Sequence, residues 1–201
     1  MASTTPARRT ARRQGEATRA KLMDAGMQVL AERGYHAARV DDVVEIAEVS
    51  HGSFYLYFAN KEELVLALAQ RCADELGSLT ATLGDISPDA AGREALREWL
   101  TGFLEIYRSY GVVVRSWVEN QVSNAELTQL GLDTFASIAE ALTERLSRSH
   151  PADATVRLVA LVSMMERFTF LVVTRDLGDD DHVLDTFATV VHRAFFAGVP
   201  A

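Results

Sequence analysis

Residues 39–64 constrain the fold of this chain more than any other segment. They read RVDDVVEIAEVSHGSFYLYFANKEEL, and this pattern predicts a short helix, a tight turn, a second short helix and the start of a third. Apolar residues recur at helical spacing in the first of these helices, at Val40, Val43, Val44 and Ala47. The segment therefore predicts a compact helix-turn-helix, a motif that presents the N-terminus of a helix to DNA.

Two short-range patterns mark where the second and third helices begin. Ser50 lies at an N-cap position, where its hydroxyl can accept a hydrogen bond from an otherwise unpaired backbone N–H. Asn60 is followed three residues later by Glu63, which is the pattern of a capping box. Between the caps, Tyr55 and Tyr57 place two hydroxyl groups away from the predicted core.

The same residues resemble the DNA-binding domain of TetR-family transcriptional regulators. The resemblance runs without gaps over about residues 16–68, and it is carried by the motifs Gly34-Tyr35, Val40-Asp41-Asp42-Val43, Val49-Ser50-His51-Gly52-Ser53-Phe54-Tyr55, Tyr57-Phe58 and Lys61-Glu62-Glu63-Leu64.

The chain departs from that family at two positions. Arg39 stands where the family usually has Thr or Ser, and losing a capping hydroxyl weakens a helix start by roughly 0.5–2 kcal/mol. Arg39 could instead reach a DNA phosphate. Glu48 stands where the family usually has Gly, so it must accept the geometry of the turn, and it adds a negative charge near DNA.

The predicted DNA-binding surface consists of the second short helix and its flanks. His51 and Tyr55 are four residues apart on one face, and both side chains can hydrogen-bond to base edges. Gly52 can offer backbone contacts, whereas the hydroxyl side chains and Lys61 suit phosphates. The predicted DNA-binding residues are Arg39, Ser50, His51, Gly52, Ser53, Tyr55, Tyr57 and Lys61.

The distribution of charge agrees with a polyanionic partner, although the net charge of −8 does not. Residues 1–61 carry nine Lys and Arg residues against seven acidic residues, a net charge of +2, and the remainder of the chain carries −10. Binding to DNA needs a local basic patch rather than a basic total. We expect residues 1–15, which include Arg8, Arg9, Arg12 and Arg13, to form a disordered basic arm that adds to DNA affinity.

Helical periodicity runs through almost all of the 201 residues and only four prolines interrupt it, so the predicted fold is all-α. We expect a three-helix DNA-binding domain at residues 16–61, with a first helix at about 16–33. A long helix from Lys61 joins it to a helical domain at residues 62–201. The later helices are expected at about 89–110, 112–122, 125–148, 151–174 and 182–197.

The C-terminal domain resembles the EthR-type subgroup of the same family, more weakly than the N-terminal domain does. The resemblance rests on Phe103-Leu104-Glu105 with Tyr107, Met165-Glu166-Arg167 and Val183-Leu184-Asp185-Thr186. It implies an elongated apolar tunnel for a small hydrophobic effector, and a homodimer formed through the last two long helices.

Six residues are predicted to contact the effector. Phe103, Tyr107 and Met165 match tunnel positions of that subgroup, although the subgroup has a polar amide at the position of Met165. Trp117, Asn120 and Phe168 are added from their helical spacing. Aromatic residues and methionines that converge from several helices are typical of apolar ligand pockets, and they are equally compatible with plain core packing.

Other functional classes find little support. The single cysteine, Cys72, excludes an intramolecular disulfide framework, and the five histidines lack metal-ligand spacing, so we expect no enzyme, cofactor or metal. No apolar run approaches the ~18 residues of a membrane span, and we expect a cytoplasmic protein. The predicted function is a homodimeric repressor that a small apolar effector releases from a palindromic operator. The alternatives are an activator on the same fold, or a helical ligand-binding protein without DNA function.

Overall fold

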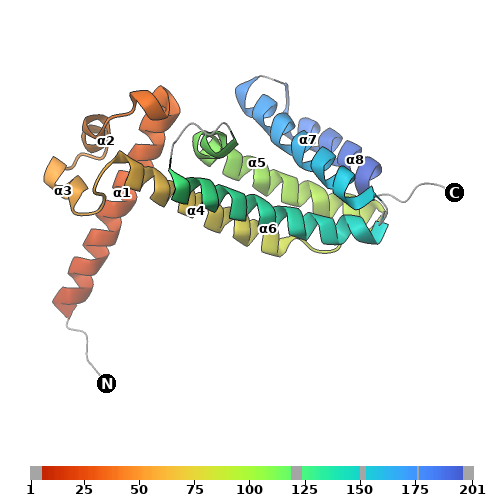
Figure 1. Ribbon diagram of the computed structural model, residues 1–201, viewed down its shortest axis with the longest axis horizontal. Coiled ribbons are helices and arrows are strands. Elements are labelled where there is room, and N and C mark those ends of the chain that lie inside the picture. The colour runs from red at the N-terminus through yellow and green to blue at the C-terminus, as the bar shows by residue number, and fades with distance from the viewer. Residues whose placement is uncertain (1–5, 119–123, 150–152, 176, 197–201) are drawn as a thin grey trace. The chain divides into compact units, whose positions relative to one another are not determined.

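The computed structural model describes residues 6–118, 124–149, 153–175 and 177–196, and all regular elements in these ranges are helices (Figure 1). This confirms the predicted all-α fold. The elements are α1 (Pro6–Ala37), α2 (Val40–Ile46), α3 (His51–Tyr55), α4 (Lys61–Thr82), α5 (Ala90–Val118), α6 (Ala125–Ser149), α7 (Ala154–Thr174), α8 (Asp180–Val191) and the π-helical segment η2 (His192–Phe196). None of the described helices is long and apolar enough to cross a membrane.

The chain divides into two compact units. The first contains residues 1–71 and 112–127, and the second contains residues 72–111 and 128–201, within the described ranges. Both α4 and α5 contribute residues to both units. These bounds differ from the domain boundary predicted between residues 61 and 62, which stays a prediction.

Helix α1 begins ten residues earlier than the sequence analysis predicted. It starts at Pro6, so residues 6–15 are helical rather than part of the expected disordered arm. Proline is well suited to the first position of a helix, and the Ala and Arg residues that follow are strong helix formers. At the other end, Gly34 leaves the helical path with φ 73° and ψ 169°, which agrees with the expected break at this glycine.

The core of the first unit forms where α1, α3 and α4 meet. Leu22, Phe54 and Leu64 are almost completely buried, and Phe54 packs on Phe58 with ring centroids 5.7 Å apart. The guanidinium of Arg19 lies 5.4 Å from the Phe58 ring centroid, so a cation from α1 covers this core. These contacts stabilise α3, because an isolated helix of five residues is not stable in water.

In the second unit, α7 and α8 lie side by side (Figure 1), and their contact includes a stacked pair of aromatic rings. Phe168 of α7 and Phe187 of α8 stack with centroids 3.7 Å apart. Leu142 of α6 and Leu161 of α7 are fully buried in the same unit. Phe195 and Phe196 of η2 are buried as well, so α8 and η2 belong to the core of the second unit.

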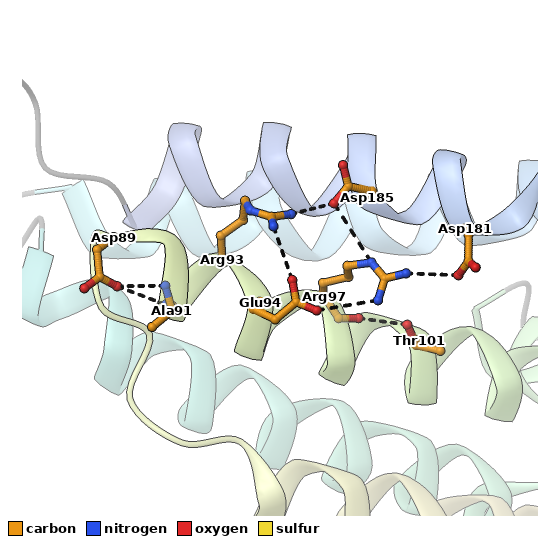
Figure 2. Close-up of polar contacts among 9 residues, drawn as sticks. Asp89, Ala91, Arg93, Glu94, Arg97, Thr101, Asp181 and Asp185 are labelled. Atoms are coloured by element: carbon orange, nitrogen blue, oxygen red, sulfur yellow. Dashed lines mark hydrogen bonds and ion pairs between the residues drawn. The ribbon is translucent and has the colours of Figure 1, made fainter.

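The start of α5 is fixed by the side chain of Asp89. The Asp89 Oδ1 accepts a hydrogen bond from the backbone N–H of Ala91 (Figure 2). It also accepts from the Gly92 N–H and from the Ser87 hydroxyl. The hydrogen bond from Ser87, followed by that from the Gly92 amide, lowers the pKa of the Asp89 carboxyl. A Cβ at Gly92 would lie 1.9 Å from the Ser87 carbonyl oxygen, so this close turn requires glycine.

A ladder of ion pairs joins α5 to α8. Arg93 contacts Asp185 at 2.6 Å and Arg97 contacts Asp181 at 2.9 Å (Figure 2). Because the arginines and the aspartates are each four residues apart, every pair lies one helical turn from the next. This spacing fixes an antiparallel register between the two helices.

Helix α5 continues through the position where the sequence analysis expected a break. Gly111 was expected to separate two helices, but α5 runs to Val118 with a single distortion at Tyr110 (φ −118°, ψ 15°). Tyr110 is buried, and its hydroxyl donates to the Glu75 carboxylate at 2.7 Å. The helix is therefore distorted at Tyr110 without ending there, and the hydrogen bond to Glu75 holds the distorted residue in place.

Candidate nucleic-acid interface

The turn between α2 and α3 is a Schellman motif with glutamate at the position that glycine usually takes. The Val49 N–H donates to the Val44 carbonyl at 3.1 Å, and the Glu48 N–H donates to the Glu45 carbonyl at 3.2 Å. This pattern requires a left-handed residue directly after the helix cap. Glu48 supplies it at φ 54°, and no other non-glycine residue in the described part of the chain has a positive φ. The turn thus keeps its geometry despite the departure from the family.

Helix α3 begins as predicted, with Ser50 as its N-cap. The Ser50 Oγ accepts from the Ser53 N–H at 3.1 Å and lies 3.0 Å from the Ser53 Oγ. Phe54 faces the core, whereas His51 and Tyr55 are exposed on the outer side, Tyr55 at 57%. The two predicted base-reading side chains are therefore held on a buried support and face solvent.

Gly52 has open space around its Cα. A Cβ built there would meet the Ser50 Oγ at 3.7 Å, which is an ordinary van der Waals contact. Packing within the chain does not require glycine at this position. A missing side chain here leaves room for another backbone to approach α3 closely, and the contact of Gly52 with DNA stays a prediction.

Arg39 lies at the N-cap of α2 and is exposed, as a phosphate contact requires. The Arg39 side chain makes no capping hydrogen bond, and only the reciprocal bond of a capping box is formed, because the Asp42 carboxylate accepts from the Arg39 backbone N–H at 3.2 Å. The same carboxylate pairs with Arg33 at 3.2 Å. Asp42 thus connects the start of α2 to α1 and leaves the Arg39 guanidinium outside the cap.

Lys61 lies at the start of α4, and the structure gives its ammonium a different partner from the predicted phosphate. Its Nζ donates to the carbonyl oxygens of Tyr35 at 2.7 Å and Ala38 at 3.1 Å. It also lies 4.4 Å from the Tyr35 ring centroid. The carbonyls at the end of α1 have no partners within the helix, and a cation is the group that satisfies them best. Lys61 therefore joins α1 to α4.

Tyr57 is half-buried, between the exposed Tyr55 and the buried Phe58. A Cβ at Gly15 would lie 3.3 Å from the Tyr57 hydroxyl oxygen, so this hydroxyl lies against α1. The early start of α1 places this part of the helix beside the tyrosine.

Two further residues belong to this surface that the sequence analysis did not select. Leu56 follows α3 and is 81% exposed, the largest exposure among the large apolar side chains of the described residues. The carboxylate of Asp41 on α2 lies 2.7 Å from the His51 Nε2. An alternating polar and apolar pattern could have indicated Leu56. The contact with Asp41 spans ten residues and depends on the angle between two helices.

The predicted effector residues fall into two groups. In the second unit, Phe103, Tyr107 and Met165 are buried and Phe168 is half-buried, and Phe103 stacks on Trp99 with centroids 5.6 Å apart. The backbone of Trp117 lies in the part of α5 that belongs to the first unit, and its side chain lies outside the described part of the chain, as does all of Asn120. The indole N–H of Trp99 is buried without a hydrogen-bond partner among the described residues.

A short helix that is capped by serine, supported by a buried phenylalanine and exposed through His51 and Tyr55 defines a helix-turn-helix DNA-binding protein. Residues 22–68 match the family model described as "Bacterial regulatory proteins, tetR family".

Comparisons over longer parts of the chain agree. The chain is 27% identical to the HTH-type transcriptional regulator EthR of Mycobacterium tuberculosis, over 85% of this chain and 82% of that protein. It is 29% identical to the fatty acid metabolism regulator protein of Bacillus subtilis, over 54% of this chain and 56% of that protein. A TetR-like transcriptional regulator from Rhodococcus sp. RHA1 superposes with a TM-score of 0.71 at 25% identity, over 88% of this chain and 93% of the other.

Residues 22–68 thus carry the DNA-binding domain of the TetR family of bacterial transcriptional regulators, and the chain is similar to EthR over most of its length. The matched family and relatives are regulators rather than enzymes, which confirms the predicted class.

Proposed function

We propose that this protein is a homodimeric repressor that binds a palindromic operator through α3 and is released by a small apolar effector. The observation that carries the DNA-binding part is the exposed face of α3, where His51 and Tyr55 are held on the buried Phe54. Arg39, Ser50, Gly52, Ser53 and Tyr57 are proposed to support these contacts at the backbone of DNA. A protein that acts on chromosomal operators works in the cytoplasm.

Substitutions at Tyr55 test the DNA-binding part. DNA sites are first selected from a random-sequence pool, and affinity is then measured by fluorescence anisotropy. Tyr55→Ala is expected to weaken binding by about 1–3 kcal/mol per half-site and to relax preference at one base pair. Tyr55→Phe is the matched control, because it keeps the ring and removes only the hydroxyl. If Tyr55→Ala lowers affinity equally for selected and random DNA, Tyr55 does not read a base.

The proposed dimer interface lies on α7 and α8. Val156 and Val159 of α7 are 72% and 61% exposed, and Val190 of α8 is 48% exposed. Symmetric contacts between two protomers are the usual use of such apolar side chains. Phe187, Val191 and Phe195 do not belong to this surface, because these side chains are buried within the second unit.

The proposed effector site is the aromatic core of the second unit. Phe103, Tyr107, Met165 and Phe168 supply apolar area, and the unpartnered indole N–H of Trp99 offers a hydrogen-bond donor. An unpaired buried donor costs about 1–3 kcal/mol, which a ligand oxygen could recover. An acyl chain with a carbonyl or carboxyl oxygen fits both features, and one relative is named as a regulator of fatty acid metabolism.

The release mechanism is a shift between two conformations. Two copies of α3 must lie about 34–36 Å apart to enter successive major grooves. The effector weakens DNA binding only if it binds a conformation with another spacing more tightly. Residues of α4 belong to both units, so this helix is the proposed connection.

The proposed effector site and release mechanism are tested with palmitoyl-CoA and palmitic acid. Acetyl-CoA is the control, because it lacks the long acyl chain. The long-chain compounds should raise the melting temperature and lower operator affinity together. Phe103→Ala should reduce both effects and leave ligand-free DNA binding near that of the wild type. If ligands stabilise the protein and operator affinity never changes, the repressor mechanism fails. A reporter gene placed behind the selected site distinguishes repression from activation.

A further inference from the structure

Leu56 lies opposite the residues that anchor α3 in the core. It is the C-cap of α3 with helical φ −73° and ψ −22°, and the Phe58 N–H donates to the Phe54 carbonyl at 3.0 Å, so the helical path continues through Phe58. Successive helical residues are about 100° apart, so Leu56 lies about 180° from the direction midway between Phe54 and Phe58. Because both phenylalanines are buried, Leu56 faces away from the core and is 81% exposed.

The space over Gly52 lies beside the Leu56 side chain. Tyr55 and Leu56 follow Gly52 by three and four residues, the spacing at which residues are neighbours on a helix surface. Helical side chains lean toward the N-terminus, so Leu56 extends over the turn that contains Gly52. Neither neighbour would come within 4 Å of a Cβ built at Gly52, whose nearest contact is the Ser50 Oγ at 3.7 Å. A group of another molecule can therefore touch the Gly52 backbone and Leu56 together.

The side chain of Leu56 has no hydrogen-bonding group, which restricts the base edges that it can contact favourably. Thymine presents an apolar C5 methyl group in the major groove, whereas the edges of guanine, adenine and cytosine are read through their donors and acceptors. A leucine placed against those polar groups removes their water and supplies no hydrogen bond, which is unfavourable. Against a thymine methyl, the same leucine removes apolar surface from water, which is favourable.

We propose that Leu56 is a specificity-determining residue of the DNA-binding surface and contacts the C5 methyl of a thymine that lies over Gly52. This inference rests on the proposed DNA-binding function. Each half-site should then contain at least one thymine whose methyl group contributes to affinity. Burying one methyl group strengthens binding by about fourfold, so removing it should weaken each half-site by about that factor.

Deoxyuridine tests this contact, because it pairs as thymine does and lacks only the C5 methyl. Binding sites are selected from a random-sequence pool with the wild type, and each thymine is then replaced in turn by deoxyuridine in both half-sites. Affinities are measured by fluorescence anisotropy for the wild type, Leu56→Met, Leu56→Ala and Ile46→Ala. Methionine keeps an apolar side chain of similar size. Ile46→Ala is the matched control, because Ile46 is an exposed apolar residue of α2.

The wild type, Leu56→Met and Ile46→Ala should each bind about fourfold more weakly per half-site when deoxyuridine replaces one particular thymine. Leu56→Ala should bind the two DNAs equally at that position. It should also keep the wild-type melting temperature, because little of Leu56 is buried in the fold.

Three results would overturn the inference: the wild type is insensitive to the methyl group of every thymine, Leu56→Ala keeps the wild-type methyl preference, or Leu56→Ala lowers affinity equally for selected and random DNA. The last result would show that Leu56 contacts the DNA backbone. If the wild type selects no sequence from the pool, the proposed function itself fails.

Discussion

Glu48 holds a left-handed backbone conformation in the turn between α2 and α3, with φ 54°. In this conformation the Cβ of an L-residue crowds a carbonyl oxygen, at a cost of roughly 1–2 kcal/mol, whereas glycine has no Cβ. Glu48→Gly is therefore expected to raise the free energy of unfolding by about 1 kcal/mol. Urea denaturation followed by circular dichroism measures the change.

Glu48→Ala is the matched control, because it removes the same charge and keeps the Cβ. Its stability should stay close to that of the wild type. Both variants should bind DNA more tightly at low salt, since each removes a negative charge near the phosphates. Equal stability of the two variants would show that the native backbone is not strained at this residue.

At the residue scale, contacts within about four residues were predictable from the sequence. The caps formed by Ser50 and Asn60 agree with the structure, since each hydrogen bond reaches a residue three positions later. The partners of His51 and Lys61 were not predictable. Those bonds span 10 and 26 residues, and they form only after the helices have packed.

At the scale of elements, Lys61 connects the start of α4 to the carbonyl oxygens of Tyr35 and Ala38 near the end of α1. Lys61→Ala leaves these oxygens without their cation, and hydrogen bonds to charged groups are worth about 1.5–3 kcal/mol each. We expect this variant to lose about 1–3 kcal/mol of unfolding free energy, allowing for partial exposure to water. Urea denaturation and the salt dependence of DNA binding are measured on the same samples.

Lys21→Ala serves as the control. Lys21 is an exposed residue of α1, so this substitution removes the same charge from the same unit. It should lower DNA affinity slightly and leave stability unchanged. If Lys61→Ala instead keeps wild-type stability and reduces only the salt dependence, Lys61 is a phosphate contact, as the sequence analysis expected.

The elements themselves were largely predictable, and their ends were less so. The helical periodicity and the caps gave the order of the helices, whereas Gly111 was read as a break because a glycine is unfavourable in an isolated helix. Tertiary contacts such as that between Tyr110 and Glu75 override this preference. The early start of α1 is harder to predict, because a basic segment is compatible both with a disordered arm and with a helix rich in Ala and Arg.

For the whole molecule, Val159 and Val190 lie on the surface proposed to join two protomers. The double variant Val159→Asp with Val190→Asp places four like charges in a symmetric interface and should give a monomer in analytical ultracentrifugation. Binding to a palindrome should then weaken strongly, because the two half-sites no longer bind as one unit. Removing the chain after Leu177 is a poorer test, since it deletes the buried side chains of α8 and η2.

Leu132→Asp provides the matched control, because Leu132 is also an exposed apolar residue, at 60%, but lies on α6. This variant should remain a dimer and bind the palindrome normally. If only the Leu132→Asp variant fails to dimerise, the interface lies on α6 and not on α7 and α8.

The effector core shows the limit of prediction for the whole molecule. Phe103, Tyr107 and Met165 were selected as ligand contacts, and all three are buried. A helical stripe of aromatic residues looks the same in a sequence whether it faces a ligand or the neighbouring helices. Only the arrangement of the surrounding helices separates the two cases, and that depends on contacts distant in sequence.

Cys72 is fully buried on α4 and is the single cysteine of the chain. Burial, together with the negative charge of Glu75, raises the pKa of its thiol to about 12. In the unfolded chain the pKa of the thiol is its ordinary value of 9.0, so the stability that the neutral thiol contributes is lost as pH rises from 9.0 through about 12. Below this range the folded protein should resist alkylation by iodoacetamide, because only the thiolate reacts readily. The rate of alkylation then reports how often α4 opens, and a cysteine introduced on the surface could be labelled alone for spectroscopic distance measurements across the proposed dimer.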